Sequence, residues 1–130
     1  MSSFSDESDP VFEMIDSLSE KELDALPYGI IQLDSHGVVL RYNEFEGRLA
    51  GLTRQQVLGK NFFKQVAPCT EVQEFYGRFQ LGIAARRLHC KFRFHFDFQR
   101  SAPRDVTIKL FYSDRYQTVW VLVQPIESQR

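Results

Sequence analysis

Five stretches of the chain have the apolar pattern of a β-strand, either alternating with polar residues or apolar throughout. These stretches are residues 29–34, 38–42, 91–99, 106–112 and 119–123. A turn that contains Gly37 joins the first two stretches as a hairpin, and a second short turn joins the last two. Shorter stretches with helical spacing lie between the second and third strands, and the longest of them, residues 75–86, places Phe75 and Phe79 on one face. This order predicts an antiparallel sheet with short helices packed on it.

The last predicted strand is apolar on both of its faces. One face carries Val119, Val121 and Val123, and the other carries Trp120 and Leu122. A strand that is buried on both sides needs a covering layer on each side of the sheet. The N-terminal residues supply the second layer, because their apolar side chains recur at roughly helical spacing: Phe12, Ile15, Leu18, Leu23 and Leu26. We therefore predict an α+β fold in which an antiparallel five-stranded sheet has short helices on one face and an N-terminal helical cap on the other.

Charge divides the chain at the end of this cap. Residues 1–26 contain eight acids and one base and so carry −7, which leaves +6 for the rest of a chain whose net charge is −1. We therefore predict an acidic cap over residues 1–26 and a core over residues 27–130. An ordinary solvated N-terminal arm explains the charge of the first segment equally well.

Length and composition fit one globular domain. A chain of 130 residues buries about two thirds of its unfolded surface. No apolar run approaches the ~20 residues of a membrane span, so we expect no membrane association. The two cysteines form no C-x-x-C pair, which predicts reduced thiols and a cytoplasmic protein, and the cysteines and histidines lack the spacing of a metal site.

Cys69 is the candidate reactive residue. Pro68 ends the short helix before it, and Thr70 with Gln73 has the spacing of a capping box, which predicts that a new helix begins directly after Cys69. A helix N-terminus favours the thiolate over the thiol, so the sulfur would suit nucleophilic attack or acylation. The alternative is that Cys69 is a small buried apolar residue.

Tyr42 and Glu46 flank the start of another predicted helix. Strand alternation turns the Tyr42 hydroxyl toward the core. Asn43 and Glu46 have the spacing of a capping box, and this pattern alone favours a solvent-facing carboxylate for Glu46. A buried, functional carboxyl is the alternative.

Several motifs of this sequence closely resemble the photoactive yellow proteins, over most of the chain from about Leu23 onward. They are Gln32-Leu33-Asp34, Tyr42-Asn43 with Glu46-Gly47, Lys60-Asn61-Phe62-Phe63, Val66-Ala67-Pro68-Cys69-Thr70 and Glu74-Phe75-Tyr76-Gly77. The resemblance implies a PAS fold and a blue-light photoreceptor of sensory transduction, not an enzyme, with p-coumaric acid (4-hydroxycinnamic acid) bound as a thioester on Cys69. It further implies that Tyr42 and Glu46 bind the phenolate of this chromophore. The other expected pocket residues are Phe62, Val66, Phe75, Phe96, Phe98 and Arg100.

The family mechanism implies that light isomerises the chromophore from trans to cis, that Glu46 gives up its proton and that the cap is released. We expect a monomer that signals to a downstream protein and binds neither nucleic acid nor membrane. Four positions depart from the familiar family pattern: Ala50, Leu52, Phe98 and Arg100 stand where threonine, arginine, tyrosine and methionine are expected. These changes affect the expected colour and dark-recovery rate, and for Arg100 they predict slow recovery.

Two other classes of function are alternatives to a photoreceptor. A thiol enzyme would pair Cys69 with a histidine, but no histidine lies in a matching motif. A PAS module that binds no ligand and mediates protein interactions needs neither Tyr42 nor Glu46, and it is the stronger alternative.

Overall fold

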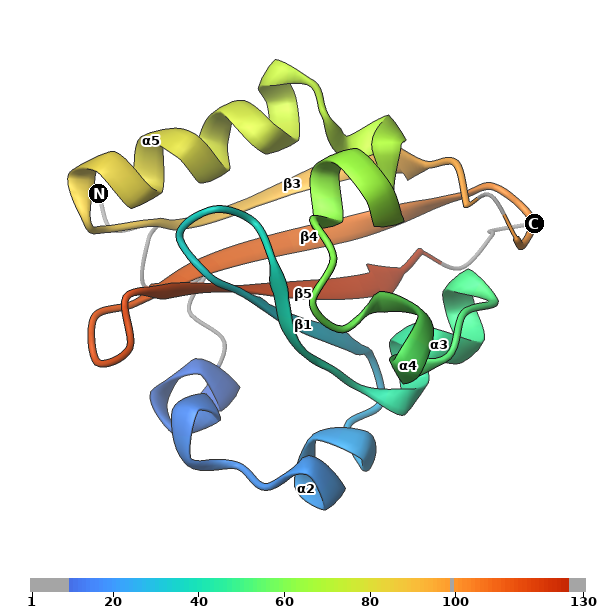
Figure 1. Ribbon diagram of the computed structural model, residues 1–130, viewed down its shortest axis with the longest axis horizontal. Helices are drawn as coiled ribbons and strands as arrows, with labels where there is room; N and C mark the ends of the chain where they lie inside the picture. The colour runs from blue at the N-terminus through green and yellow to red at the C-terminus, as the bar shows by residue number, and fades with distance from the viewer. Residues whose placement is uncertain (1–9, 99, 127–130) are drawn as a thin grey trace.

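The computed structural model describes residues 10–98 and 100–126, and the centre of this part of the chain is an antiparallel sheet of five strands. The strands are β1 (Gly29–Leu33), β2 (Val39–Tyr42), β3 (His89–Phe96), β4 (Arg104–Ser113) and β5 (Thr118–Pro125). Their order across the sheet is β2-β1-β5-β4-β3, so β1 and β5, which are distant in sequence, pair at its centre (Figure 1). The predicted α+β fold is confirmed. The third predicted strand ends earlier than expected, at Phe96, and Gln99 lies outside the described residues.

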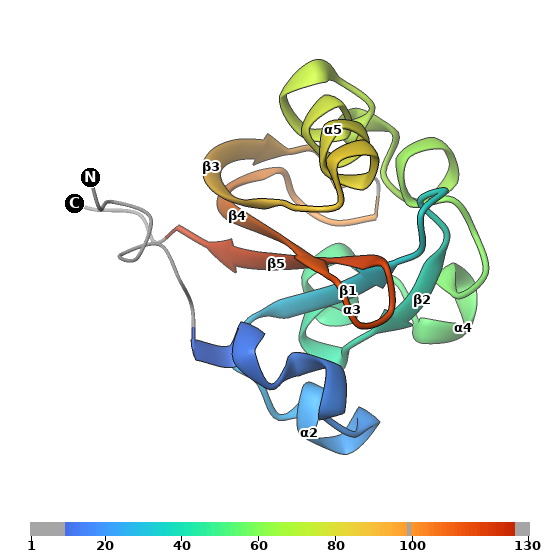
Figure 2. The same cartoon turned by 90° about the vertical axis from the view of Figure 1, so that its left-hand side faces the viewer.

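Helices lie on both faces of the sheet. They are α2 (Glu20–Asp24), α3 (Glu44–Ala50), α4 (Arg54–Val57) and α5 (Arg78–Ala85). Figures 1 and 2 show α2 on one face, together with two 3-10 turns at Pro10–Glu13 and Ile15–Ser17, and the other helices on the opposite face. The helix predicted for residues 75–86 begins as a π-helical turn, Gln73–Gly77, which continues into α5.

The two faces of β5 contact two separate hydrophobic cores. Val119, Val121 and Val123 pack with the helices, and Trp120 and Leu122 pack with the cap. All five side chains are fully buried, which explains why the sequence is apolar at every one of these positions. The cap contributes Phe12, Ile15 and Leu23 to the second core. The prediction that the N-terminal segment covers this face is confirmed for residues 10–26, whereas residues 1–9 lie outside the described part.

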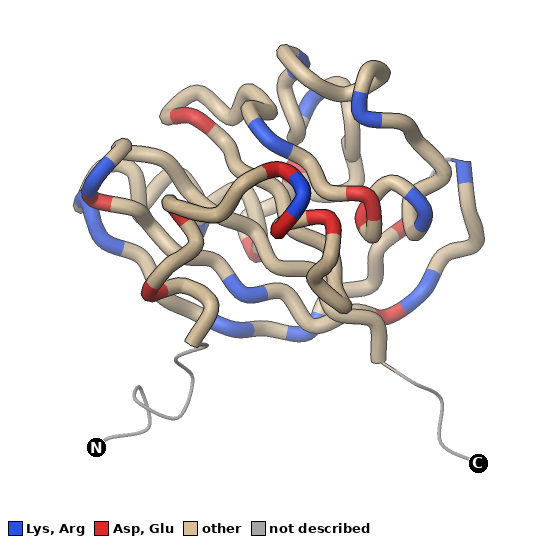
Figure 3. The backbone as a smooth tube through the Cα atoms, turned by 90° about the horizontal axis from the view of Figure 1, so that it is seen from below, with Lys and Arg blue, Asp and Glu red and all other residues tan. Residues whose placement is uncertain are grey.

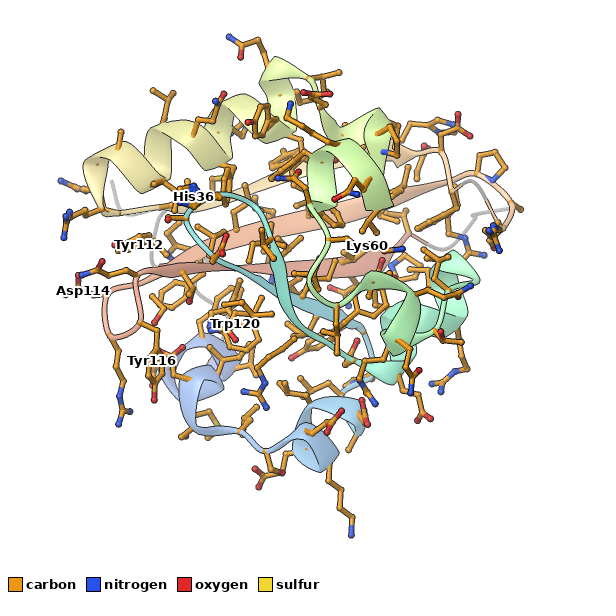
Figure 4. All side chains as sticks on the ribbon, viewed as in Figure 1. His36, Lys60, Tyr112, Asp114, Tyr116 and Trp120 are labelled. Carbon is orange, nitrogen blue, oxygen red and sulfur yellow. The ribbon has the colours of Figure 1, made fainter. Side chains whose placement is uncertain are left out.

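Asp16 attaches the cap to the sheet through two hydrogen bonds. It accepts one from Trp120 Nε1 at 2.9 Å and another from Ser113 Oγ at 2.6 Å. Figure 4 shows Trp120 on the side of the sheet that faces the N-terminal turns. At the other end of the cap, Ser19 and Glu22 form a capping box, which begins α2. The α2 segment presents acidic positions on the cap side of the molecule (Figure 3).

Candidate functional site

A cavity of about 180 Å³ lies between α3, α4, the π-helical turn Phe62–Val66 and the end of β3. The lining residues are Tyr42, Glu46, Ala50, Leu52, Gln56, Val57, Lys60, Phe62, Gln65, Val66, Ala67, Phe96, Asp97, Phe98 and Arg100. Seven of the nine predicted site residues are in this set, and the other two are Cys69 and Phe75. The structure therefore brings together side chains that are up to 58 positions apart in the sequence, from Tyr42 to Arg100.

Glu46 is buried in the wall of this cavity and is only 1% exposed. Its Oε1 atom has no hydrogen-bond partner among the described residues. Burial raises the pKa of Glu46 from 4.5 to about 8, because a carboxylate would lose its hydration there without gaining a counter-charge. Glu46 is therefore mainly a neutral acid at pH 7, and it can donate a proton into the cavity.

The backbone around Glu46 explains why its carboxyl turns inward. Asn43 Oδ1 accepts from the Glu46 N–H at 3.1 Å, so the predicted cap of α3 is present. The second bond of a capping box, from the Asn43 N–H to the Glu46 carboxyl, is missing, because the Asn43 N–H donates to the Ile30 carbonyl on β1 at 3.1 Å. The interpretation that the pattern alone favoured, a Glu46 carboxylate that faces solvent, is therefore wrong. Gly29 makes room for the inward carboxyl, because a Cβ at this position would lie 2.0 Å from Glu46 Oε1.

Tyr42 lies beside Glu46 at the end of β2 and is 3% exposed. Burial raises the pKa of its phenol well above the usual range, and the Glu46 carboxylate raises it further. Tyr42 therefore keeps its proton at any physiological pH. Together, Tyr42 and Glu46 place two O–H donors in one desolvated cavity, where a negatively charged oxygen would be bound strongly.

Cys69 lies in a 3-10 turn, Pro68–Thr70, and not outside the N-terminus of a helix. Thr70 Oγ1 donates to the Ala67 carbonyl at 2.6 Å, and the next turn begins after Val72 without a side-chain cap. The predicted capping box of Thr70 and Gln73 is wrong. The thiol is half-buried, and burial raises its pKa, although the backbone N–H of Asp97 opposes the effect. The predicted preference for thiolate is therefore also wrong, and Cys69 is a neutral thiol next to the cavity.

Aromatic rings form much of the wall. Phe96 and Phe98 are stacked with their ring centroids 4.3 Å apart, although Phe98 lies beyond the end of β3. Phe62 is 1% exposed and lines the opposite side. The predicted wall residue Phe75 lies one layer deeper, against Phe62, with 5.9 Å between the ring centroids. It supports the wall and does not line the cavity.

The mouth of the cavity is polar. Arg100 is exposed there, and its backbone passes close to the end of α3, where a Cβ at Gly51 would lie 2.5 Å from the Arg100 carbonyl oxygen. The polar residues that were not predicted from the sequence are Gln56, Lys60, Gln65 and Asp97. Strand alternation pointed Asp97 away from the phenylalanines, and Asp97 is indeed exposed while Phe96 and Phe98 are buried. It lines the cavity all the same, as part of its polar mouth. Nothing in the pattern around Lys60 marked it as a lining residue.

The described part of the chain contains no group of three histidine, cysteine, aspartate or glutamate side chains placed to hold a metal ion. It also contains no helix that is both long enough and apolar enough to cross a membrane.

Comparisons with known proteins agree on one family. The family described as PAS fold matches residues 18–126. The photoactive yellow protein of Rhodothalassium salexigens is 37% identical over 118 residues, which cover 91% of this chain and 94% of the relative. The photoactive yellow protein of Halochromatium salexigens is 40% identical over 120 residues, which cover 90% and 93%. The crystal structure of the photoactive yellow protein domain from the sensor histidine kinase Ppr of Rhodospirillum centenum is similar with a TM-score of 0.81 and 43% identity, and the match covers 86% of this chain and 97% of that domain.

Proposed function

This chain belongs to the photoactive yellow protein family, within the PAS fold, and on that premise we propose that it is a blue-light photoreceptor that binds p-coumaric acid as a thioester on Cys69. The observation that carries the proposal is Glu46, a buried neutral acid whose Oε1 is unpartnered in the cavity wall. An unsatisfied buried carboxyl normally destabilises a fold. A ligand with an anionic oxygen would supply the missing partner.

The residues present fit a phenolate ligand that is attached through sulfur. Tyr42 and Glu46 would donate hydrogen bonds to the phenolate oxygen, and the aromatic wall would hold the ring. A thioester at Cys69 carries no charge, which suits a half-buried sulfur whose thiol pKa is raised by burial. The remaining residues that we assign to the ligand are Phe62, Val66, Phe96, Phe98 and Arg100, with Phe75 behind them. When bound, the coumaryl group supplies absorption of blue light and isomerisation from trans to cis.

Glu46 would couple isomerisation of the bound group to the stability of the fold. Its proton is available to an acceptor in the cavity, and after it leaves, a carboxylate remains buried without a counter-ion. Such a charge costs several kcal/mol, against a total stability of about 5–15 kcal/mol. We propose that this cost is relieved by release of the N-terminal cap, which exposes the face of β5 that carries Trp120 and Leu122. The exposed face would signal to a downstream protein from a cytoplasmic monomer.

Reconstitution tests the proposal directly. The chromophore-free protein is mixed with an activated ester of p-coumaric acid, and a yellow pigment that bleaches in blue light is expected. Its intact mass should rise by one coumaryl group. A protein that takes up no coumaryl group under these conditions would refute the proposal and favour the PAS interaction module that binds no ligand.

A further inference from the structure

Arg54 lies where the cap, β2 and α4 meet, and each nitrogen of its guanidinium has an acceptor. Nε donates to the main-chain carbonyl of Tyr42 at 2.9 Å. Nη1 pairs with Glu20 at 2.9 Å, and Nη2 pairs with Asp24 at 2.5 Å. The Arg54 and Asp24 side chains are only 28% and 24% exposed, so this pair is largely shielded from solvent. Glu20 is 63% exposed, so its pair with Arg54 is open to screening by salt. One side chain therefore links the cavity residue Tyr42 to two acids of the cap helix α2.

Local structure fixes both ends of this link. Arg54 is the first residue of α4, and the Thr53–Gln56 capping box holds that end of the helix. Asp24 also accepts a hydrogen bond from the Glu44 N–H at the start of α3, at 2.8 Å. The Arg54 side chain is thus anchored in one element while its acceptors belong to others. A shift of any of them changes the geometry of the whole cluster.

The chemistry of arginine makes the link stiff. The guanidinium is planar, and its donors keep a fixed arrangement, so Nε cannot follow a movement of the Tyr42 carbonyl unless Nη1 and Nη2 move as well. Asn43 also bonds to the cap, through Nδ2 to the Leu23 carbonyl at 2.8 Å, and to the Tyr28 carbonyl just after the cap at 3.0 Å. Those hydrogen bonds join uncharged groups. Arg54 instead pairs with two acids of the cap, Glu20 and Asp24, and the same guanidinium also bonds to the Tyr42 carbonyl.

We propose that Arg54 is a positioning residue that couples Tyr42 in the cavity to the cap helix α2, so that release of the cap breaks the bonds of Arg54 to Glu20 and Asp24. This inference rests on the proposed photoreceptor function, because it assigns a route from the cavity to the cap. It predicts two separable effects: Arg54 holds α2 in the dark, and it transmits the response to light.

The dark effect is tested by hydrogen exchange of the α2 amides in the full-length, chromophore-free protein. Arg54→Met should speed this exchange about tenfold at low salt, because it removes two ion pairs and a charge-assisted hydrogen bond. Molar salt should speed exchange in the parent and leave the variant unchanged. The matched control is Arg48→Met on α3, where the ion pair with Glu44 is 3.6 Å long and both side chains are 65% exposed. Equal exchange in the two variants would overturn the proposal.

The light effect is tested with Arg54→Lys in the chromophore-loaded protein. Lysine keeps a positive charge near Glu20 and Asp24 but has no second nitrogen for the Tyr42 carbonyl. Dark exchange of α2 should stay within about twofold of the parent, and the light-induced increase should fall by more than half. A full light response in Arg54→Lys would refute the coupling. A parent that forms no pigment refutes the proposed function and the light coupling with it, whereas the dark exchange still decides whether Arg54 holds the cap.

Discussion

Replacing Glu46 with glutamine tests whether the carboxyl of the cavity is neutral because it is buried. Glutamine has nearly the same shape but cannot ionise. In the parent protein the pKa of Glu46 rises from 4.5 in its ordinary state to about 8 in the fold. The folded state therefore binds a proton more tightly than the unfolded state, so stability is present at low pH and declines as pH rises through this window. Above pH 8 the decline from this group ends.

The magnitude follows from the two pKa values. Linkage gives a loss of roughly 3–4 kcal/mol between pH 5 and pH 8 for one carboxyl with this shift. Urea unfolding of the chromophore-free protein, followed by circular dichroism at several pH values, measures it. The free energy of unfolding of Glu46→Gln should exceed that of the parent by a margin that grows by this amount across the range. Other titrating groups cancel in the comparison.

A control variant on the same helix separates burial from a general change of charge. Glu44 is 65% exposed in its pair with Arg48, so Glu44→Gln should follow the parent across the range to within about 1 kcal/mol. If the curve of Glu46→Gln also ran parallel to the parent from pH 5 to pH 8, Glu46 would ionise freely in the fold. The reasoning from burial would then be refuted.

Three further predictions concern the pigment. Cys69→Ser should abolish the mass increase on reconstitution and Cys90→Ser should keep it, since Cys69 lies two positions after the lining residue Ala67, whereas Cys90 lies on the edge strand β3 and pairs with Leu110; loss in the second variant contradicts the assignment. Gly29→Ala should push the Glu46 carboxyl aside, lower stability by about 1–3 kcal/mol in urea unfolding and shift the absorption maximum, and an unchanged spectrum argues against this contact. Arg100→Met should speed dark recovery, and salt should speed the parent more, because a cation at the cavity mouth stabilises the ionised carboxyl; equal recovery rates would exclude this pairing.

The layers of the fold could be predicted because each depends on a repeated pattern. The apolar residues on both faces of β5 required a second covering layer, and the N-terminal segment was the element available to form it. The capping boxes that begin α2 and α4 were also readable, because each needs only two residues at a fixed spacing.

The two errors at the site, at Glu46 and at Cys69, have different causes, and only the first is a contact between distant residues. Asn43 had the spacing to receive the Glu46 side chain, but its N–H bonds to Ile30, 13 positions earlier, once β1 and β2 pair. The Thr70 side chain could cap a following helix or donate to a preceding carbonyl. The backbone at Val72 is extended, so no helix begins directly after Thr70, and the hydroxyl donates to the Ala67 carbonyl. The residues of the site were recognisable from the family resemblance, whereas the environments of Glu46 and Cys69 needed the fold.

The position of Trp120 gives the molecule an optical reporter of its own. It is the single tryptophan of the chain, it is fully buried, and its indole N–H donates to Asp16 of the cap. Departure of the cap would bring water to the indole and remove this acceptor, so tryptophan emission should move to longer wavelength. Intrinsic fluorescence would therefore report whether the cap is bound, without an added label, while visible absorption would report the state of the chromophore in the cavity. Recording both after one flash would give the delay between the chemical event and the structural one.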